Sequence, residues 1–273
     1  MSLPLAKKLA FENLSEWTFY TKMNRLRKEG FVMKRDGIGL QCEVLQLTKK
    51  GFDYLKYDLG ELREMRYAAQ SVAHDYWATA FQLGEFALQP RKNVEFLTEQ
   101  QIICTDDSLL PRWQPKSREH IPDGMTCIKS GLRESVIAIE VELNLKPLNR
   151  YDKIGYYFES ALSKVDVVFW VCASTKIAQT ISDRLFQMKL RNFDIHQFVI
   201  TSEFRIRGWD ALVRSGSFLN RSIRDVYLAK GHQTPENMPK KDRKNELLQL
   251  LFPTAKTPRP SRTYLKAPLS TLS

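Results

Sequence analysis

The middle of the chain alternates between helix-like and strand-like patterns of apolar residues. Apolar positions at helical spacing predict helices over 71–88, 150–164 and 174–190. Short apolar or alternating runs predict extended segments over 93–98, 118–129, 135–145, 165–173 and 195–201. Because strands followed by helices end here in a β-α-β order, we expect an α/β fold, an α/β/α sandwich around a mixed sheet.

The first 60 residues carry a different pattern. Ser15 is a good N-cap for an amphipathic helix, and Gly30 is placed to end it. Two extended runs then flank the turn signal RDGIG, and a further helix begins at about Thr48. This order, with NRLRKEGFV followed by LQLTKKGFDYL, resembles a winged helix. Only LPLAKKLAFEN precedes Ser15, so we expect the first helix of that module to be short or absent.

A winged helix implies a recognition helix in the major groove of double-stranded DNA and a wing beside it. The polar side of the helix and the wing would then contact DNA through Thr18, Lys22, Arg25, Lys28, Lys34 and Arg35. The alternative is a solvated charged face on an ordinary helix.

The net charge of +11 is concentrated at the two ends of the chain. We divide the sequence into a DNA-binding module at 1–66, a central domain at 67–229 and a basic flexible tail at 230–273. Lys and Arg exceed Asp and Glu by four, one and six in these segments. Such ends favour a polyanionic partner, because each neutralised phosphate releases a counterion.

Several classes of protein are disfavoured by simpler features. The longest apolar run, 165–173, is far shorter than a membrane span, so we expect no membrane insertion and a cytoplasmic location. The four cysteines form no CxxC pair, which argues against a zinc ribbon or a disulfide framework. The four histidines form no HxH pair, which argues against a metal site built on paired histidines.

Charged residues interrupt the strand expected over 136–146. Its odd positions are all apolar, whereas its even positions include Glu140, Glu142 and Lys146. We therefore expect the odd face to enter the core and the even face to carry the charge. An antiparallel hairpin about the turn SGLRES would set Asp123 opposite Glu142 and Met125 opposite Glu140. Three carboxylates would then gather on one patch.

Carboxylates at such separations repel one another unless a cation lies between them. A hard divalent ion, Mg²⁺ or Mn²⁺, suits Asp123, Glu140 and Glu142 as ligands. Lys146 would pair with the carboxylates, contact the substrate phosphate or stabilise developing charge. The alternative is an acidic strand edge that faces solvent.

These residues resemble the PD-(D/E)xK nuclease signature, present as Pro122-Asp123-Gly124 and Glu140-Val141-Glu142 with Lys146. The resemblance implies a restriction-endonuclease-like sandwich that hydrolyses phosphodiesters with a metal ion. In this role Asp123, Glu140, Glu142 and Lys146 are the catalytic residues. The chain departs from the pattern in one respect: Glu142 occupies the usual position of the lysine, and the nearest Lys follows four residues later.

The running order HDYWATAFQL, FLTEQQI, HIPDG and AIEVELNLK resembles replication-relaxation proteins and the MobC-type relaxases of mobilisable plasmids, over about residues 10–205. This implies a bacterial relaxase that nicks double-stranded DNA at a plasmid transfer origin, with accessory mobilisation or coupling proteins as partners. The alternatives are another restriction or repair nuclease, or a non-catalytic DNA-binding regulator of plasmid replication or transfer on a nuclease-like scaffold.

Further residues are candidates by position. Glu99 begins a helical turn before the acidic strands and would support the ligands or serve only as a cap. Lys153 and Tyr156 follow the acidic strand on a helix and would contact the ligands or a phosphate. The adjacent His74 and Asp75 lie in a mostly apolar helix and suggest a structural pair.

Overall fold

The computed structural model describes residues 3–11, 13–36, 43–58, 71–84, 93–116, 118–160, 164–231 and 248. In the N-terminal region the elements are α1 (Leu3–Ala10), α2 (Glu16–Lys28), β1 (Val32–Asp36), β2 (Glu43–Leu47) and α3 (Lys49–Asp58). The central region contains α4 (Val72–Leu83), β3 (Val94–Thr98), α5 (Glu99–Cys104), β4 (Gly124–Ser130), β5 (Arg133–Glu142), α6 (Leu148–Ser160), β6 (Val167–Cys172), α7 (Thr175–Gln187) and β7 (His196–Ile200). A 3₁₀ turn (Phe193–Ile195) comes directly before β7. After β7 come α8 (Thr201–Arg207), a second 3₁₀ turn (Gly208–Asp210) and α9 (Ile223–Ala229).

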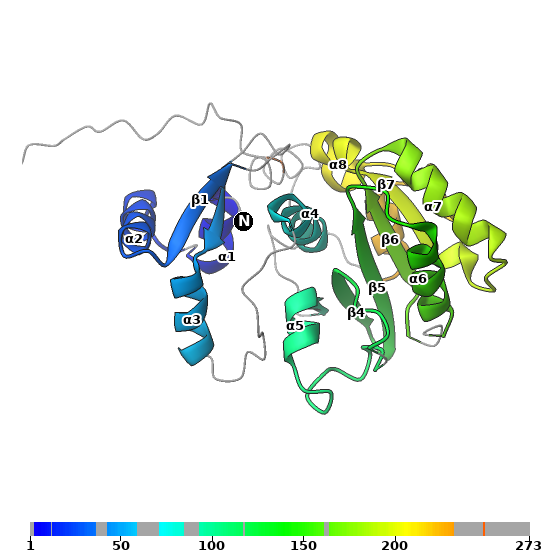
Figure 1. Cartoon of the computed structure of the whole chain (residues 1–273), viewed down its shortest axis with the longest axis horizontal. Coiled ribbons are helices and arrows are strands. Elements are labelled where there is room, and N and C mark those ends of the chain that lie inside the picture. The colour runs from blue at the N-terminus through cyan, green and yellow to red at the C-terminus, as the bar shows by residue number, and fades with distance from the viewer. Residues whose placement is uncertain are drawn as a thin grey trace, which may run out of the picture.

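The N-terminal elements follow the predicted order of helix, hairpin and helix (Figure 1). Ser15 caps α2 by accepting a hydrogen bond from the Thr18 amide, and Gly30 has the positive φ that ends the helix. The short first helix, α1, is present, and β1 and β2 pair antiparallel. The turn between them, the boundary expected near residue 66 and most of the expected tail lie outside the described residues. A winged helix therefore stays an interpretation of this order.

The central region is built on one five-stranded mixed sheet in the order β3-β4-β5-β6-β7. The first three strands are antiparallel neighbours, and β5, β6 and β7 run parallel. Parallel neighbours need crossovers, which α6 and α7 supply. This confirms the predicted α/β class and the mixed sheet.

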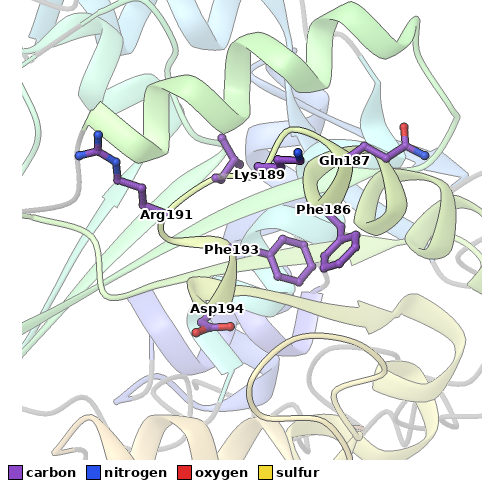
Figure 2. Close-up of a pocket in the computed structure, with 7 residues that line it drawn as sticks. Phe186, Gln187, Lys189, Arg191, Phe193 and Asp194 are labelled. Carbon is purple, nitrogen blue, oxygen red and sulfur yellow. The ribbon is translucent and has the colours of Figure 1, made fainter.

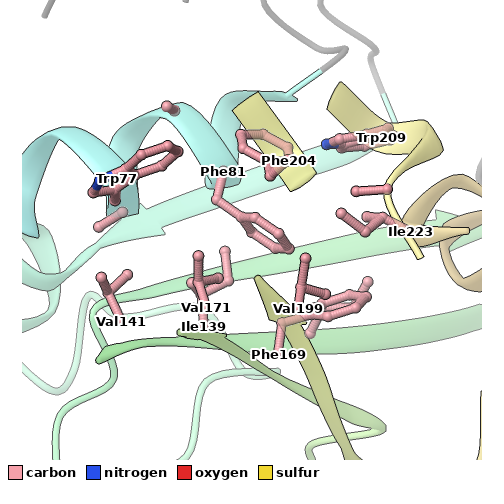
Figure 3. Close-up of a cluster of buried hydrophobic side chains, with 14 of the residues drawn as sticks. Trp77, Phe81, Ile139, Val141, Phe169, Val171, Val199, Phe204, Trp209 and Ile223 are labelled. Carbon is pink, nitrogen blue, oxygen red and sulfur yellow. The ribbon is translucent and has the colours of Figure 1, made fainter. Parts of the chain in front are cut away.

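Helices cover both faces of the sheet, so it has two apolar cores. On one face α4 and α8 place Phe81 and Phe204 against Ile139 and Phe169 of the strands (Figure 3). On the other face α6 and α7 pack on Val136 and the remaining alternate strand residues. The N-terminal hairpin contributes one buried side chain, Val44, to the first core.

The odd face of β5 enters a core, as expected, but the alternative of an acidic strand edge that faces solvent is wrong. Both faces of β5 are buried from Ser135 onward, and Glu140 and Glu142 are only 3% and 2% exposed. The reason is that α6 folds back over the even face as the crossover to β6. The two carboxylates are therefore held in a covered layer.

The expected hairpin register is also wrong by two residues. Gly124 pairs with Ile139 and Met125 with Ala138, so Met125 is not opposite Glu140. Ser130 pairs with Arg133, which leaves a two-residue turn in which Gly131 has φ +61°. A tight turn of this kind favours glycine at a positive φ. The strand ends at Glu142, so Lys146 lies in the following loop rather than on the strand.

The described part of the chain also bears on membrane spans and on the cysteines. No helix there is both long enough and apolar enough to cross a membrane. Cys127 and Cys172 are buried free cysteines, and burial raises the pKa of the Cys127 thiol to about 12, so it stays protonated.

Candidate active site

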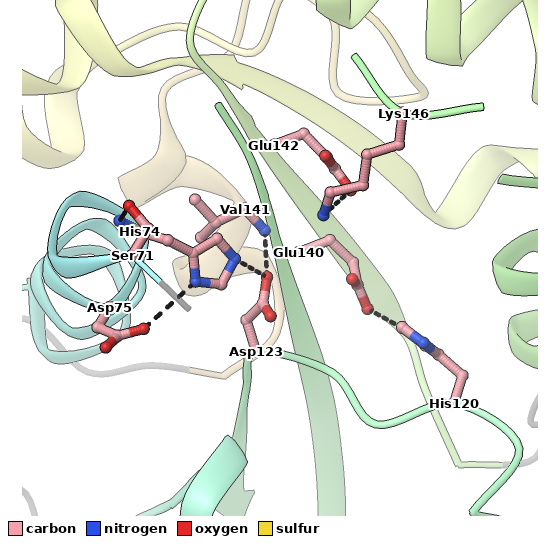
Figure 4. A network of polar contacts seen from close by, with 9 residues as sticks. All are labelled: Ser71, His74, Asp75, His120, Asp123, Glu140, Val141, Glu142 and Lys146. Carbon is pink, nitrogen blue, oxygen red and sulfur yellow. Dashed lines mark hydrogen bonds and ion pairs between the residues drawn. The ribbon is translucent and has the colours of Figure 1, made fainter. Parts of the chain in front are cut away.

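Asp123 lies immediately before β4, beside the part of β5 that extends past the β4 pairing and is paired on one side only, with β6. Its Oδ2 atom accepts a hydrogen bond from the Val141 amide at 2.6 Å and thus takes the place of the missing strand partner. The same oxygen is 3.2 Å from Nε2 of His74 on α4 (Figure 4). Asp123 is therefore fixed both by the central strand and by the helix that covers it.

His74 connects two carboxylates. Its Nδ1 atom is 3.6 Å from Oδ1 of Asp75, while its Nε2 atom faces Asp123. Burial lowers the pKa of His74, but hydrogen bonds to Asp123 and Asp75 and their charges outweigh this and raise it to about 10. His74 is therefore an imidazolium at neutral pH. The sequence suggested only the His74–Asp75 pair.

Glu140 is paired with His120 on the other side of β5 (Figure 4). Its Oε1 atom is 2.6 Å from Nε2 of His120, whose ring packs edge-on against Tyr157 and Phe158 of α6. Burial raises the pKa of Glu140 to about 7, and the positive charge of His120 offsets part of this effect. Near neutral pH, Glu140 is thus poised between its charged and neutral forms.

Glu142 is paired with Lys146. The Lys146 Nζ atom lies 3.2 Å from Oε1 of Glu142, and the Lys146 backbone amide donates to the buried Tyr151 hydroxyl at 2.9 Å. The second carboxylate oxygen, Oε2, is buried and has no hydrogen-bond partner among the described residues. Burial raises the pKa of Glu142, and the charges of Lys146 and Arg150 oppose that rise.

Glu99 belongs to the same electrostatic cluster. It is the first residue of α5, whose N-cap Thr98 forms a capping box with Gln101. Burial raises the pKa of Glu99, the negative charge of Asp123 raises it further, and His74 and His120 oppose the rise. The cap is thus made by Thr98 and Gln101, and Glu99 lies among the charged residues around Asp123.

Arg150, in the first turn of α6, is a site residue that the sequence reasoning missed. Its positive charge affects the pKa of both Glu142 and His120. Lys153 and Tyr156, further along α6, are exposed, and Tyr156 is 58% exposed. The structure shows neither of them in contact with Asp123, Glu140 or Glu142, so their predicted contact with a phosphate stays a prediction.

The three carboxylates are the kind of ligand that a hard divalent cation prefers, but they are not gathered around one point. Asp123, Glu140 and Glu142 offer oxygen atoms only, and the unpartnered buried Oε2 of Glu142 is an oxygen that a cation would satisfy. Each carboxylate is, however, engaged by its own base: His74, His120 or Lys146. Within the described ranges no three His, Cys, Asp or Glu side chains are grouped so as to hold one ion. Binding of Mg²⁺ or Mn²⁺ stays a prediction.

The residues predicted to contact DNA lie on α2 and β1. Lys22, Arg25, Lys28 and Arg35 are exposed, whereas Thr18 and Lys34 are partly buried. The Thr18 hydroxyl is engaged with Ser15 at the start of α2, and Arg25 forms an ion pair with Glu29 at 2.6 Å. Lys22 and Lys28 are therefore better placed than Arg25 to bind a phosphate.

The sequence did not predict the contacts of His74 with Asp123 or of His120 with Glu140, because each partner is far away along the chain. His120 lies three residues before Asp123, in HIPDG, so its proximity to that acid is visible in the sequence, but its partner Glu140 is twenty residues away. His74 reaches Asp123 only because α4 crosses the sheet.

Comparisons with protein families, with characterised proteins and with solved structures find no match for this chain.

Proposed function

We propose that the chain is a metal-dependent phosphodiesterase that nicks DNA. The observation that carries this proposal is the presence of three carboxylates where two adjacent strands meet: Glu140 and Glu142 are buried, Asp123 is partly buried, and Lys146 is bonded to Glu142. Burying two carboxylates beside a third is costly, so a fold that retains them has a use for the charge. A mixed sheet covered by helices on both faces is also what the PD-(D/E)xK resemblance implies.

In this proposal Asp123, Glu140 and Glu142 bind Mg²⁺ or Mn²⁺, which supplies a Lewis acid for the phosphate and lowers the pKa of a bound water. Lys146 and Arg150 bind the phosphate oxygens and stabilise the charge that develops on them. Tyr151 holds the Lys146 backbone in place, and His74 fixes the orientation of Asp123.

The finer proposal is the relaxase role: a nick at a plasmid transfer origin in a bacterial cell, with accessory mobilisation or coupling proteins. Its support is the running order of sequence segments described above and the basic ends of the chain. The exposed Lys22 and Lys28 on α2 offer a means of holding duplex DNA while the acids act.

The test is cleavage of supercoiled plasmid carrying a candidate transfer origin, in Mg²⁺, in Mn²⁺ and in EDTA. We expect nicked circles with either metal and none in EDTA, and loss of nicking with retained binding in Asp123→Asn. Glu134→Gln is a matched control, because Glu134 is an exposed acid on the same strand. DNA that is shifted but never nicked in any metal would overturn the proposal.

A second function is a non-catalytic DNA-binding regulator. Its specific support is that each of the three carboxylates already has a basic partner, so the cluster is compensated without an ion. In that case Asp123→Asn would change stability but not DNA binding or plasmid topology.

A further inference from the structure

A hollow lies on the surface where α7 ends and the chain turns toward β7 (Figure 2). It is lined by the aromatic rings of Phe186 and Phe193, the cations Lys189 and Arg191, and the polar side chains of Gln187 and Asp194. Because α7 returns to the start of β7, the hollow lies at the opposite end of the parallel strands from Glu142. It is therefore separate from the acidic site.

The aromatic part of the hollow is open to a partner. Phe186 is 68% exposed, and its ring meets that of Phe193 edge to face with 5.6 Å between centroids. Large apolar side chains are usually withdrawn from water, so an exposed ring supported by a second ring offers a flat apolar surface. A planar ligand could stack on it.

Lys189 is placed at the hollow at an energetic cost. It follows the C-cap of α7, and its φ is +55°, a left-handed conformation that glycine adopts freely and lysine does not. The left-handed conformation ends α7 and leaves Lys189 exposed in the lining of the hollow. Within the described part of the chain neither Lys189 nor Arg191 forms an ion pair, so both charges are available to an anion.

A strip of exposed residues joins the hollow to the acidic site. The helix α6 runs from the acidic end of β5 back along the sheet, and Arg150, Lys153 and Tyr156 follow one another on its exposed side. At its far end, Glu159 accepts a hydrogen bond from the Arg191 amide at 2.9 Å. The neighbouring α7 is locked to α6 by the paired bonds of Arg184 to Asp152. The helix α6 thus carries two cations and one aromatic ring on its exposed side, and its far end is bonded to the chain at the hollow.

We propose that this surface binds a single strand of nucleic acid, with a base stacked on Phe186 and backbone phosphates on Lys189 and Arg191. Stacking on exposed aromatics beside a basic track is how proteins bind single strands without reading their sequence. A base edge offers N–H donors to Asp194 and Gln187, whereas the carboxylate side chains of an acidic peptide offer none. The proposal goes beyond nicking, since it requires neither a metal nor the acidic cluster.

The test is fluorescence anisotropy of a labelled 20-nucleotide oligo(dT) with the full chain, in EDTA so that cleavage plays no part. We expect Phe186→Ala to weaken binding about tenfold, as loss of one stacked base does. Phe186→Trp keeps the stacking surface and should retain the affinity, with quenching of the new indole on binding.

Lys189→Gly gives a second, independent readout. It removes a phosphate contact and also relieves the left-handed strain, so binding should weaken severalfold while the thermal midpoint stays equal or rises. Asn220→Gly is the matched control, because Asn220 also has a positive φ (62°) but lies outside the hollow. It should leave binding unchanged.

Two results would overturn the proposal. One is oligo(dT) binding that neither Phe186→Ala nor Lys189→Gly changes by as much as twofold. The other is an acidic peptide that displaces the oligonucleotide and shows the same sensitivity to Phe186→Ala, which would assign the hollow to a protein. Because Asp123→Asn should not affect oligo(dT) binding, failure here is distinguishable from failure of the nicking proposal.

Discussion

The Nε2 atom of His120 lies 2.6 Å from Oε1 of Glu140, and the two residues come from a loop and a central strand twenty positions apart. Glu140 is almost fully buried, so this contact is its main compensation for the loss of water. We therefore expect the free energy of unfolding to depend on this pair, because His120 offsets the cost of burying the charge of Glu140.

Removing one partner of this pair should destabilise the protein, whereas replacing both should not. His120→Phe keeps the ring packing on Tyr157 but removes the bond to Glu140, and we expect it to lower the free energy of unfolding by about 2 kcal/mol. The double variant His120→Phe with Glu140→Met should regain most of that loss, because no buried charge is left unpaired. Urea unfolding at pH 7 measures both, and a double variant as unstable as the single one would contradict the pairing.

The stability of the fold should depend on pH through His196. Burial lowers the pKa of this residue to about 3, and its Nδ1 atom accepts a hydrogen bond from the Trp170 indole at 3.0 Å. Because the unfolded chain binds the proton near pH 6.5 and the folded chain does not, stability falls as pH drops below 6.5. The contribution between pH 7 and pH 5 is about 2 kcal/mol.

His196→Gln should remove that part of the pH dependence. Unfolding curves of the variant and the wild type, compared at pH 7 and pH 5, isolate it from the other titrating groups. Parallel losses of stability in the two proteins would show that His196 does not titrate in this way.

Arg150 should act on the substrate phosphate rather than on stability. It is exposed in the first turn of α6, and its charge affects both Glu142 and His120. We expect Arg150→Gln to slow plasmid nicking by about tenfold to a hundredfold with little change in the thermal midpoint. Arg133→Gln, which removes an exposed arginine at the other end of β5, is the control. Equal nicking rates in the two variants would remove Arg150 from the site.

On α2, Lys22 and Arg25 should contribute differently to duplex binding. Arg25 already pairs with Glu29, so its charge is partly used within the helix. Lys22→Gln should therefore weaken duplex binding more than Arg25→Gln and reduce the slope of log affinity against log salt by about one. Anisotropy titrations over a salt series measure this, with Lys116→Gln as an exposed control in the central region. Unchanged slopes in both α2 variants would place duplex binding elsewhere.

The sequence predicted the helices and strands well, but it did not predict which strand faces the helices would bury. The strands that became β5, β6 and β7 and the Ser174 cap of α7 follow from local apolar spacing and capping chemistry. The burial of Glu140 could not be predicted, because it depends on α6 folding over that face. The register was wrong because six residues were assigned to a turn that Gly131 closes in two.

The sequence predicted the acids of the candidate site and offered Lys146 as a partner for them, but it did not predict their pairing with histidines. Asp123, Glu140, Glu142 and Lys146 stood out because charges interrupt an apolar pattern, which is a signal in the sequence itself. The contacts of His74 and His120 with these acids are set by tertiary packing and leave no periodic trace. No feature of the sequence distinguishes Arg150 from other exposed arginines on helices.

The most direct measurement of the central claim is a Mn²⁺ titration followed by the electron paramagnetic resonance signal of the free ion. The account predicts that about one Mn²⁺ binds per chain, that Asp123→Asn and Glu142→Gln each weaken this binding by tenfold or more, and that Glu134→Gln does not. Mn²⁺ binding that is absent, or equal in all four proteins, would contradict it.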